Sequence, residues 1–425
     1  MHLPRRTVLL LAMAAALLMS MLIDLHLTTS YPGVDLRDKV VGSRSLLAGR
    51  SLYYDPWRPG DPEELADPML PPGTSLTRFT GTPFQALLTA PLAPWPFRST
   101  RLLWFVLQYA LLIGAVWMVV KVYGSSEEQR TMVMAAVLVV ILASRPWHLH
   151  VERGQVYVLA MALMAGLFAG VARKRDLLAG VLAAALVLLK PTYGLIALPL
   201  VVQATRRLWI GGIGFLLVMA GVFALIPDGL RSWVEYGEAM KVWSSQPGMG
   251  EPPVTGPADY SYPAVIEGIT DMQAIHPMEF EDGSALSILS GLGKPVGAGV
   301  AWALFAAFLL GVLLLTARKL RRLRPSDLLL LGFCCWSVLM MLLPTPRFDY
   351  QVVQWVAPMA VVLLTYPKRP FAWNVMAVFA AALIIGAWEV LPVDTLLAEA
   401  IMLLLIGALL WERMQAPPDL GPLAR

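Results

Sequence analysis

The chain has 425 residues, of which 57% are hydrophobic and only 15% are charged. Ordinary soluble domains are about 45–50% apolar and about 25% charged, so this composition excludes an ordinary soluble protein. The only two cysteines, Cys334 and Cys335, are adjacent, so they cannot close a disulfide loop and do not have the spacing of metal ligands. The net charge is +4, and its distribution along the chain says more about membrane orientation than its total does. No nucleic-acid-binding patch is predicted.

Apolar runs recur along the chain, and runs of about 17 to 22 residues are long enough to cross a hydrocarbon core of ~30 Å. We therefore predict one all-α membrane domain over residues 1–425, with about twelve spans. These lie near residues 7–25, 99–120, 131–143, 156–172, 177–190, 192–204, 208–226, 298–317, 327–343, 350–366, 371–388 and 396–412. Lys190-Pro191 separates two of them, which indicates tilted or discontinuous helices there. No small-residue cleavage site follows the first run before Asp24, so we expect it to be a retained anchor.

The basic residues predict the orientation of the chain in the membrane. If the N-terminus is cytoplasmic, the short basic turns at residues 173–175, 206–207, 318–324 and 368–369 are all cytoplasmic, as the positive-inside rule requires. The two long polar loops, 26–98 and 227–297, then lie on the extracytoplasmic face, and the C-terminus is cytoplasmic. This pattern predicts a multi-pass protein of the bacterial inner membrane whose polar chemistry faces outward.

The first outer loop begins with YPGVDLRDKVVGSRSLLAGRSLYYDP. Its apolar residues between Val34 and Leu47 can share part of one helical surface, which predicts a helix lying on the bilayer surface. Asp35 and Asp38 are three residues apart, so both carboxylates project from nearly the same side of this helix. Periodicity alone favours a solvated charged face, and a catalytic carboxylate pair is the alternative.

The segment LTRFTGTPFQALLTAPLAPWPF follows in the same loop. Its apolar stretch of about 14 residues, interrupted by glycine and proline, is too short to cross a membrane. We predict a re-entrant or interfacial segment that helps to form the wall of a cavity at the membrane surface.

The turn SRPWHLHVERGQVY, between two predicted spans, is unusually dense in polar groups. His148 and His150 have no carboxylate at a matching spacing, so an interfacial hydrogen-bonding role is favoured over metal binding, and no metal site is predicted. Lys190, at the helix break, and Arg347, in the outer turn PTPRFDYQ, are cations at a depth where they need an anion or an internal partner. Either both bind a phosphate, or Lys190 snorkels and Arg347 pairs with Asp349.

The second outer loop contains RSWVEYGEAMKVW and then PPVTGPADYSYPAVIEGI. We predict a surface helix followed by a loop rich in proline, glycine and aromatic residues, Tyr260 among them. Aromatic faces suit sugar rings, which indicates acceptor binding. The same residues suit an aromatic belt at the membrane interface, and both interpretations stay open.

Four stretches of the chain carry a family resemblance when they are taken in order. They are GVDLRDKVVGSRSLLAGRSLYYDP, TPFQALLTAPLAPWPF, ERGQVYVLAMALMAGLFAGVARKRDLLAGVLAAALVLLKPTYGLIALPLVV and LPTPRFDYQVVQWVAPMAVVLL. They resemble glycosyltransferase family 87, the polyprenol-phosphate-sugar-dependent membrane transferases of the GT-C class that include phosphatidylinositol-mannoside mannosyltransferases. The resemblance spans most of residues 28–366. Tyr157, Thr82 and Asp349-Tyr350 depart from the family pattern, which leaves the sugar and the acceptor undecided.

The resemblance implies a GT-C-like helical bundle that transfers a sugar, with mannose favoured, from a polyprenyl-phosphate donor to a lipid or glycan acceptor with inversion. Asp35 matches the family's first-loop aspartate, the implied general base, and Asp38 is the second catalytic candidate. The donor phosphate-binding candidates are Lys190, Arg347, Arg153, His148 and His150. The substrate-binding candidates are Gln155, Tyr157, Tyr350 and Tyr260. The lipid-linked donor is a co-substrate, and no cofactor is expected.

A transporter or flippase of lipid-linked sugars is the alternative function. Such a protein would need polar residues through the membrane midplane and usually an internal repeat. No repeat is evident, and Glu399 is the one charge expected near the midplane. A different GT-C enzyme, such as an O-antigen-ligase-like protein, would share the outward-facing chemistry, but the Gly-Gln to Lys-Pro stretch resembles family 87 more closely.

Overall fold

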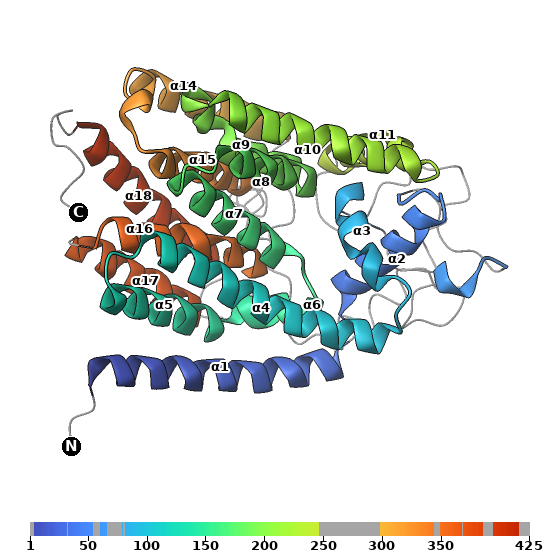
Figure 1. Ribbon diagram of the computed structural model, residues 1–425, viewed down its shortest axis with the longest axis horizontal. Helices are drawn as coiled ribbons and strands as arrows, with labels where there is room; N and C mark the ends of the chain where they lie inside the picture. The colour runs from blue at the N-terminus through green and yellow to red at the C-terminus, as the bar shows by residue number, and fades with distance from the viewer. Residues whose placement is uncertain are drawn as a thin grey trace.

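The computed structural model describes residues 4–31, 33–53, 60–65, 79, 81–245, 298–343, 349–367, 369–385 and 394–415. Within these residues every regular element is a helix, so the predicted all-α class is confirmed. Figure 1 shows an elongated bundle, with α2 (Val34–Leu47) and α3 (Pro83–Thr89) lying together at one end of it. We refer to this end as the α2 end.

Each predicted span coincides with a helical segment of the structure. In chain order these are α1 (Arg5–Ser30), α4 (Phe97–Tyr123), α5 (Glu127–Leu142), α7 (Tyr157–Ala172), α8 (Asp176–Leu189), the broken run η3 (Pro191–Tyr193), α9 (Gly194–Ala197) and η4 (Leu198–Gln203), α10 (Arg206–Leu225), α14 (Ala298–Thr316), α15 (Pro325–Leu342), η6 (Asp349–Trp355) with α16 (Val356–Thr365), α17 (Pro370–Ile385) and α18 (Asp394–Gln415). The predicted break at Lys190-Pro191 is present, because α8 ends at Leu189 and the chain continues as η3.

The number of membrane crossings is a separate question from the number of helices. Among the described residues, five helices are long and apolar enough to cross a membrane by themselves: α1, α4, α10, α14 and α15. A sixth span results if α5 is counted together with α6 (Arg145–Arg153). The other apolar helices are shorter. Several apolar helices therefore fit a membrane protein, and the arrangement of about twelve crossings stays a prediction.

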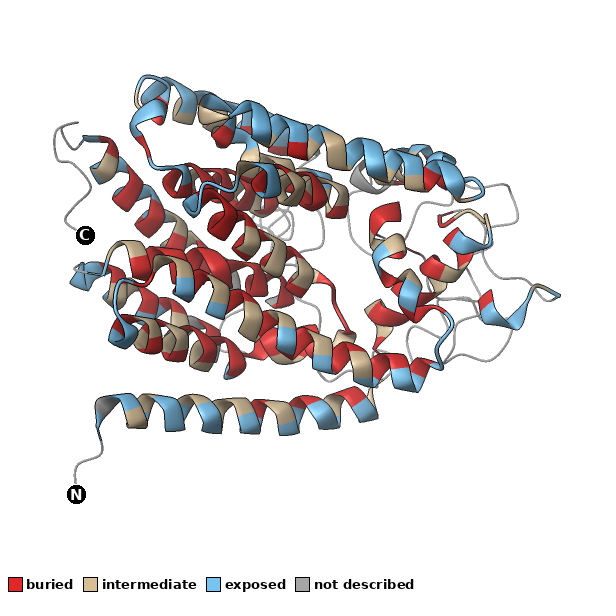
Figure 2. Cartoon of the chain, viewed as in Figure 1, coloured by how far each residue is buried: buried red, intermediate tan, exposed pale blue. Residues whose placement is uncertain are grey.

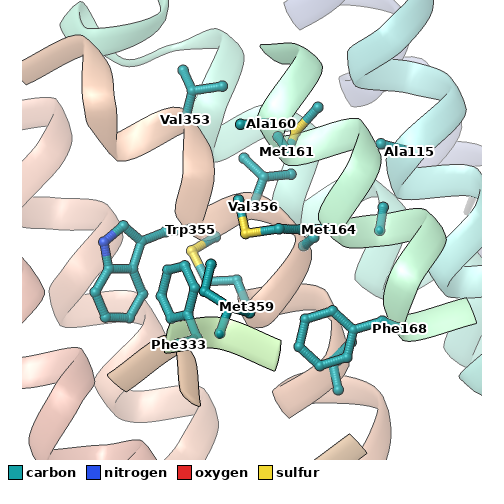
Figure 3. Packing of buried hydrophobic residues seen from close by; sticks show 14 of the residues in the cluster. Ala115, Ala160, Met161, Met164, Phe168, Phe333, Val353, Trp355, Val356 and Met359 are labelled. Carbon is teal, nitrogen blue, oxygen red and sulfur yellow. The ribbon is translucent and has the colours of Figure 1, made fainter. Parts of the chain in front are cut away.

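Helix α7 lies in the core of the bundle and packs against α4, α8 and α16. Its residues Met161, Met164 and Phe168 are fully buried in one hydrophobic cluster with Phe333 of α15 and Trp355 of η6 (Figure 3). Figure 2 shows the buried residues inside the bundle, whereas α1, α10 and α14 are largely exposed. Their exposed side chains are mainly large and apolar, which suits a surface in contact with lipid chains.

Helices α8 and α10 approach each other closely because both carry glycine where they meet. A Cβ atom on Gly180 would lie 2.0 Å from the carbonyl oxygen of Leu208, and a Cβ atom on Gly211 would lie 2.1 Å from that of Leu177. Small residues allow such backbone contact between helices in lipid, where van der Waals packing drives association. Any larger residue at either glycine would push the two helices apart.

The helix predicted in the first polar loop is present as α2, but its charged side chains are not solvated. Arg37, Asp38 and Lys39 are only 1%, 6% and 4% exposed. Helix α3 covers this part of α2, and the Ser43 hydroxyl donates a hydrogen bond to the carbonyl oxygen of Ala86 at 2.8 Å. The expectation of a solvated charged face is therefore wrong, because the periodicity of one helix does not reveal which segment packs against it.

The segment predicted as a turn between two spans is the short helix α6. Pro146 lies in its first turn, where the missing N–H has no helical partner to lose. Gly154 ends the helix with φ of 71°, in the left-handed region that favours glycine. The chain bends by 66° between α5 and α6, so α6 leaves the direction of α5 and contacts α1, α2 and η6 at the α2 end.

The surface helix predicted in the second polar loop is present as α11 (Gly229–Ser245). The Ser51 hydroxyl, just after α2, donates to Glu235 of α11 at 2.6 Å, and the rings of Tyr53 and Tyr236 lie 6.0 Å apart. Burial of the Tyr236 phenol raises its pKa to about 12. Helix α11 is therefore attached to the chain that follows α2.

Candidate functional site

Five residues that the sequence singled out form a continuous chain of contacts at the α2 end. The Nε atom of Arg153 donates to Oδ2 of Asp35 at 2.6 Å. The Arg153 guanidinium carbon lies 5.7 Å from the centre of the Tyr350 ring, and that ring lies 5.8 Å from the ring of Tyr157. The Lys190 ammonium lies 5.7 Å from the centre of the Tyr157 ring. A carboxylate, two cations and two aromatic rings are thus brought together.

Helix ends position these side chains. Asp35 lies in the first turn of α2, and Tyr157 is the first residue of α7. Arg153 is the last residue of α6, and Lys190 directly follows α8. An acidic residue is favoured at a helix N-terminus and a basic residue at a C-terminus, because the helix dipole places partial charges of opposite sign there. Asp35 at an N-terminus and Arg153 and Lys190 at C-termini therefore each carry the charge that the helix dipole favours.

The ion pair between Asp35 and Arg153 is only partly shielded from solvent. The Arg153 side chain is 12% exposed and the Asp35 side chain 21% exposed. Gln155 is 6% exposed and hydrogen-bonds the side chain of Tyr350. The Asp35 carboxylate therefore keeps part of its surface exposed, while Gln155 beside it is buried.

Helix α3 supports the break at Lys190. The Thr82 hydroxyl donates to the carbonyl oxygen of Leu188 at 2.7 Å, and the Gln85 amide donates to that of Leu189 at 2.8 Å. These carbonyls are among the last of α8, which lack partners within their own helix. The segment predicted as re-entrant or interfacial thus caps α8 where Lys190 leaves it.

Asp38, the second catalytic candidate, has a different environment from Asp35. Its Oδ2 atom lies 2.7 Å from the ammonium of Lys39, and both side chains are buried. That ammonium also lies 5.0 Å from the centre of the Phe79 ring. The structure therefore places Asp38 in a buried ion pair, while a catalytic role for it stays a prediction.

His148 contacts a carboxylate, although the sequence shows no acidic residue at a metal-ligand spacing from it. Nδ1 of His148 lies 2.6 Å from Oδ1 of Asp24, which is fully buried in α1. The Tyr109 hydroxyl donates to Oδ2 of Asp24 and lies 2.8 Å from the Ser20 hydroxyl. Sequence reasoning missed this role of Asp24. The sequence did contain a signal for it: Asp24 is a lone carboxylate at the end of an apolar run, and such a carboxylate needs a partner.

His150, unlike His148, contacts an aromatic ring and a backbone N–H group. Its ring is fully buried and stacks on the Trp147 ring, with centroids 5.7 Å apart. Its Nε2 atom accepts a hydrogen bond from the backbone N–H of Val158 at 3.2 Å, which is possible only while that nitrogen carries no proton. The imidazole is therefore neutral in this contact, which disfavours the predicted phosphate-binding role of His150.

Arg347 and Tyr260, the two remaining candidates, lie outside the described residues. Within the part of the chain that the structure describes, no group of three or more His, Cys, Asp or Glu side chains could hold a metal ion.

The family model of glycosyltransferase family 87 matches residues 79–346, which is more than half of the chain. The chain belongs to glycosyltransferase family 87. No match to a curated protein was found.

Membership of glycosyltransferase family 87 makes the chain a membrane glycosyltransferase, which acts on a sugar donor and an acceptor. The apolar helices agree with this assignment. The matched residues include Arg153, Tyr157 and Lys190, whereas Asp35 and Tyr350 lie outside them. The structure brings both of these to Arg153, so the candidate site joins the matched part of the chain to segments on either side of it.

Proposed function

We propose that this glycosyltransferase moves a sugar, with mannose favoured, from a polyprenyl-phosphate donor to a lipid or glycan acceptor, and that Asp35 is the general base. The observation that carries the proposal is the contact between the carboxylate of Asp35 and the guanidinium of Arg153 at 2.6 Å. The reaction needs a base for the acceptor and a cation for the leaving phosphate within reach of one bound sugar.

The proposed reaction is a single displacement at the anomeric carbon. The acceptor oxygen forms a bond to that carbon while the bond from the carbon to the phosphate oxygen breaks. The bonding electrons leave with the polyprenyl phosphate, and the acceptor proton passes to Asp35. Arg153 engages Oδ2 of the carboxylate, and we assign Oδ1 to the acceptor hydroxyl. Attack from the side opposite the phosphate inverts the anomeric configuration.

Cations around the site support binding of the departing phosphate. The guanidinium of Arg153 carries five N–H donors, so one side chain can contact both a carboxylate and a phosphate. Lys190, at the other end of the contact chain, supplies a second positive charge. His148 and Arg347 are further candidates, and the rings of Tyr157 and Tyr350 would contact the sugar.

We place this chemistry on the extracytoplasmic face of the bacterial inner membrane, with both termini in the cytoplasm. The support is the distribution of basic residues in short turns. Outside the cytoplasm nucleotide sugars are scarce, which favours a lipid-linked donor. The whole chain would then act as one membrane domain, with Gln155 and Tyr260 among its substrate-binding residues.

The test is transfer of radiolabelled mannose from polyprenyl-phosphate-mannose to lipids in membranes that contain the wild-type chain or Asp35→Asn at matched protein levels. We expect Asp35→Asn to lower the rate by about 10²–10⁴-fold, the usual contribution of a general base. Asp228→Asn is the matched control, because it makes the same chemical change at an exposed position with φ of 52°, which asparagine tolerates.

The outcomes separate the parts of the proposal. Wild-type transfer by Asp35→Asn would contradict the assignment of the base. Transfer of another sugar from its polyprenyl phosphate, but not of mannose, would correct the donor sugar alone. An absence of transfer from every polyprenyl-phosphate sugar, with folded wild-type protein present, would contradict the donor class.

A further inference from the structure

Arg101 connects the two segments that supply Asp35 and Arg153. It lies in the second turn of α4, and its side chain is only 4% exposed. Its Nη1 atom donates to the carbonyl oxygen of Val151 at 3.0 Å, and its Nη2 atom donates to that of Glu152. Both carbonyls belong to the last turn of α6, directly before Arg153. The guanidinium of Arg101 thus caps the C-terminus of α6.

The same guanidinium lies against the N-terminus of α2. Gly33 is the N-cap residue of α2 and has φ of 64°. A Cβ atom on Gly33 would lie 2.5 Å from Nε and 2.6 Å from Cζ of Arg101. Any side chain at this position would displace the guanidinium. Asp35 follows two residues later, in the first turn of α2.

Helices α2 and α6 also meet directly beside Arg101. A Cβ atom on Gly154, the residue that ends α6, would lie 2.6 Å from Cβ of Leu36 and 3.1 Å from Nη1 of Arg101. Gly33 and Gly154 both have left-handed backbone conformations, and they border one guanidinium from opposite segments. This close packing fixes the spacing between the two helix ends.

We propose that Arg101 is a positioning residue for sugar transfer: it holds the ends of α2 and α6 in the register that brings the Asp35 carboxylate to Arg153. Its two hydrogen bonds go to main-chain carbonyls, so it acts through these helices rather than by touching the substrate. The inference rests on the function proposed for Asp35 and adds the residue that sets the geometry of that base.

The chemistry of arginine suits this task better than that of lysine. A planar guanidinium can donate to two neighbouring carbonyls in a fixed geometry, whereas an ammonium is a compact charge on a flexible chain. A positive charge at a helix C-terminus is also favoured by the helix dipole. Helix α4 is long and packs against α7, so it anchors the backbone of Arg101 in the bundle.

The first measurement is steady-state transfer from polyprenyl-phosphate-mannose by purified Arg101→Gln, Arg101→Lys and wild-type protein, normalised to the folded fraction from size-exclusion chromatography. A displacement of about 1 Å can cost about 10²-fold in rate, so we expect a fall of that order in kcat for Arg101→Gln. Arg101→Lys keeps the charge and should recover part of kcat. Arg98→Gln is the control, because Arg98 is exposed on the same helix.

The second measurement is hydrogen–deuterium exchange, which needs no substrate. In Arg101→Gln we expect faster exchange at the end of α6, at the amides of Gly154 and Gln155, and in the first turn of α2. Arg98→Gln should leave both regions unchanged. Faster exchange spread evenly over the whole bundle would point to general destabilisation and would contradict a positioning role.

Together the two measurements decide the inference. Wild-type kcat per folded molecule in Arg101→Gln, or unchanged exchange at both helix ends, overturns it. If Arg101→Gln does not fold, Arg101→Lys is judged by the same criteria. Asp35→Asn, assayed in parallel, separates the two proposals. An inactive Asp35→Asn beside a fully active Arg101→Gln refutes only the positioning role, whereas a fully active Asp35→Asn refutes the proposed function.

Discussion

Nδ1 of His148 lies 2.6 Å from Oδ1 of Asp24, so a buried carboxylate joins α6 to α1 at the α2 end of the bundle. The same carboxylate accepts a hydrogen bond from Tyr109 of α4. A buried carboxylate of this kind is stable only while its partners surround it. The contact therefore makes the position of His148 depend on a residue 124 positions away in the sequence.

Replacing Asp24 should weaken this junction. In Asp24→Asn one oxygen acceptor becomes an N–H donor, so either Tyr109 or His148 loses its acceptor. We expect a loss of about 1–3 kcal/mol in stability, measured as thermal unfolding in detergent. Tyr109→Phe leaves the buried Oδ2 atom of Asp24 without this donor and should cost a similar amount, about 1–3 kcal/mol. Equal stability of Asp24→Asn and wild type would contradict this account of the junction.

His150 and His148 should respond differently to substitution. His150→Leu leaves the buried N–H of Val158 without an acceptor, which should cost about 1–3 kcal/mol of stability and leave the donor KM of the folded protein unchanged. His148→Gln should instead raise the donor KM if His148 contacts the phosphate. A raised donor KM in folded His150→Leu would show that His150 binds the donor after all.

The aromatic ring of Tyr157 should matter more than its hydroxyl. Tyr157→Leu removes the ring against which the Lys190 ammonium lies, and a cation–π contact contributes about 0.5–2 kcal/mol. At about 1.4 kcal/mol for each factor of ten, we expect the donor KM to rise by about 2- to 30-fold. Tyr157→Phe keeps the ring and is the control. Equal effects of the two substitutions would show that the hydroxyl, and not the ring, is used.

The close contact between α8 and α10 should depend on Gly180. In Gly180→Ala the new methyl group would meet the carbonyl oxygen of Leu208 at 2.0 Å, so the helices must separate. We expect a loss of about 1–3 kcal/mol, the usual cost of overpacking, measured as thermal unfolding in detergent. Gly214→Ala is the matched control, because a Cβ atom at Gly214 has no neighbour within 4 Å. Equal unfolding temperatures for the two variants would contradict the contact.

Several features of the candidate site were predictable from the sequence, and others were not. Lys190 at a helix break, Arg153 in a polar turn and Asp35 at the start of a helix are local features, visible as charges beside apolar runs or proline. Asp24 and Arg101 were not assigned a role, because the groups they contact come from distant parts of the chain. The burial of Arg37 and Lys39 was missed for the same reason, since α3, which covers α2, begins at Pro83.

The sequence by itself determined that this is a membrane protein of the all-α class, where its apolar helices lie and which family it resembles, because hydrophobic runs, proline breaks and short motifs are properties of neighbouring residues. Only the tertiary structure decided that Asp35 meets Arg153, because these residues are 118 positions apart and their contact depends on how α2 and α6 pack around Arg101. Helix periodicity fixes the direction of a side chain on its own helix. Packing between helices fixes which partner it finds.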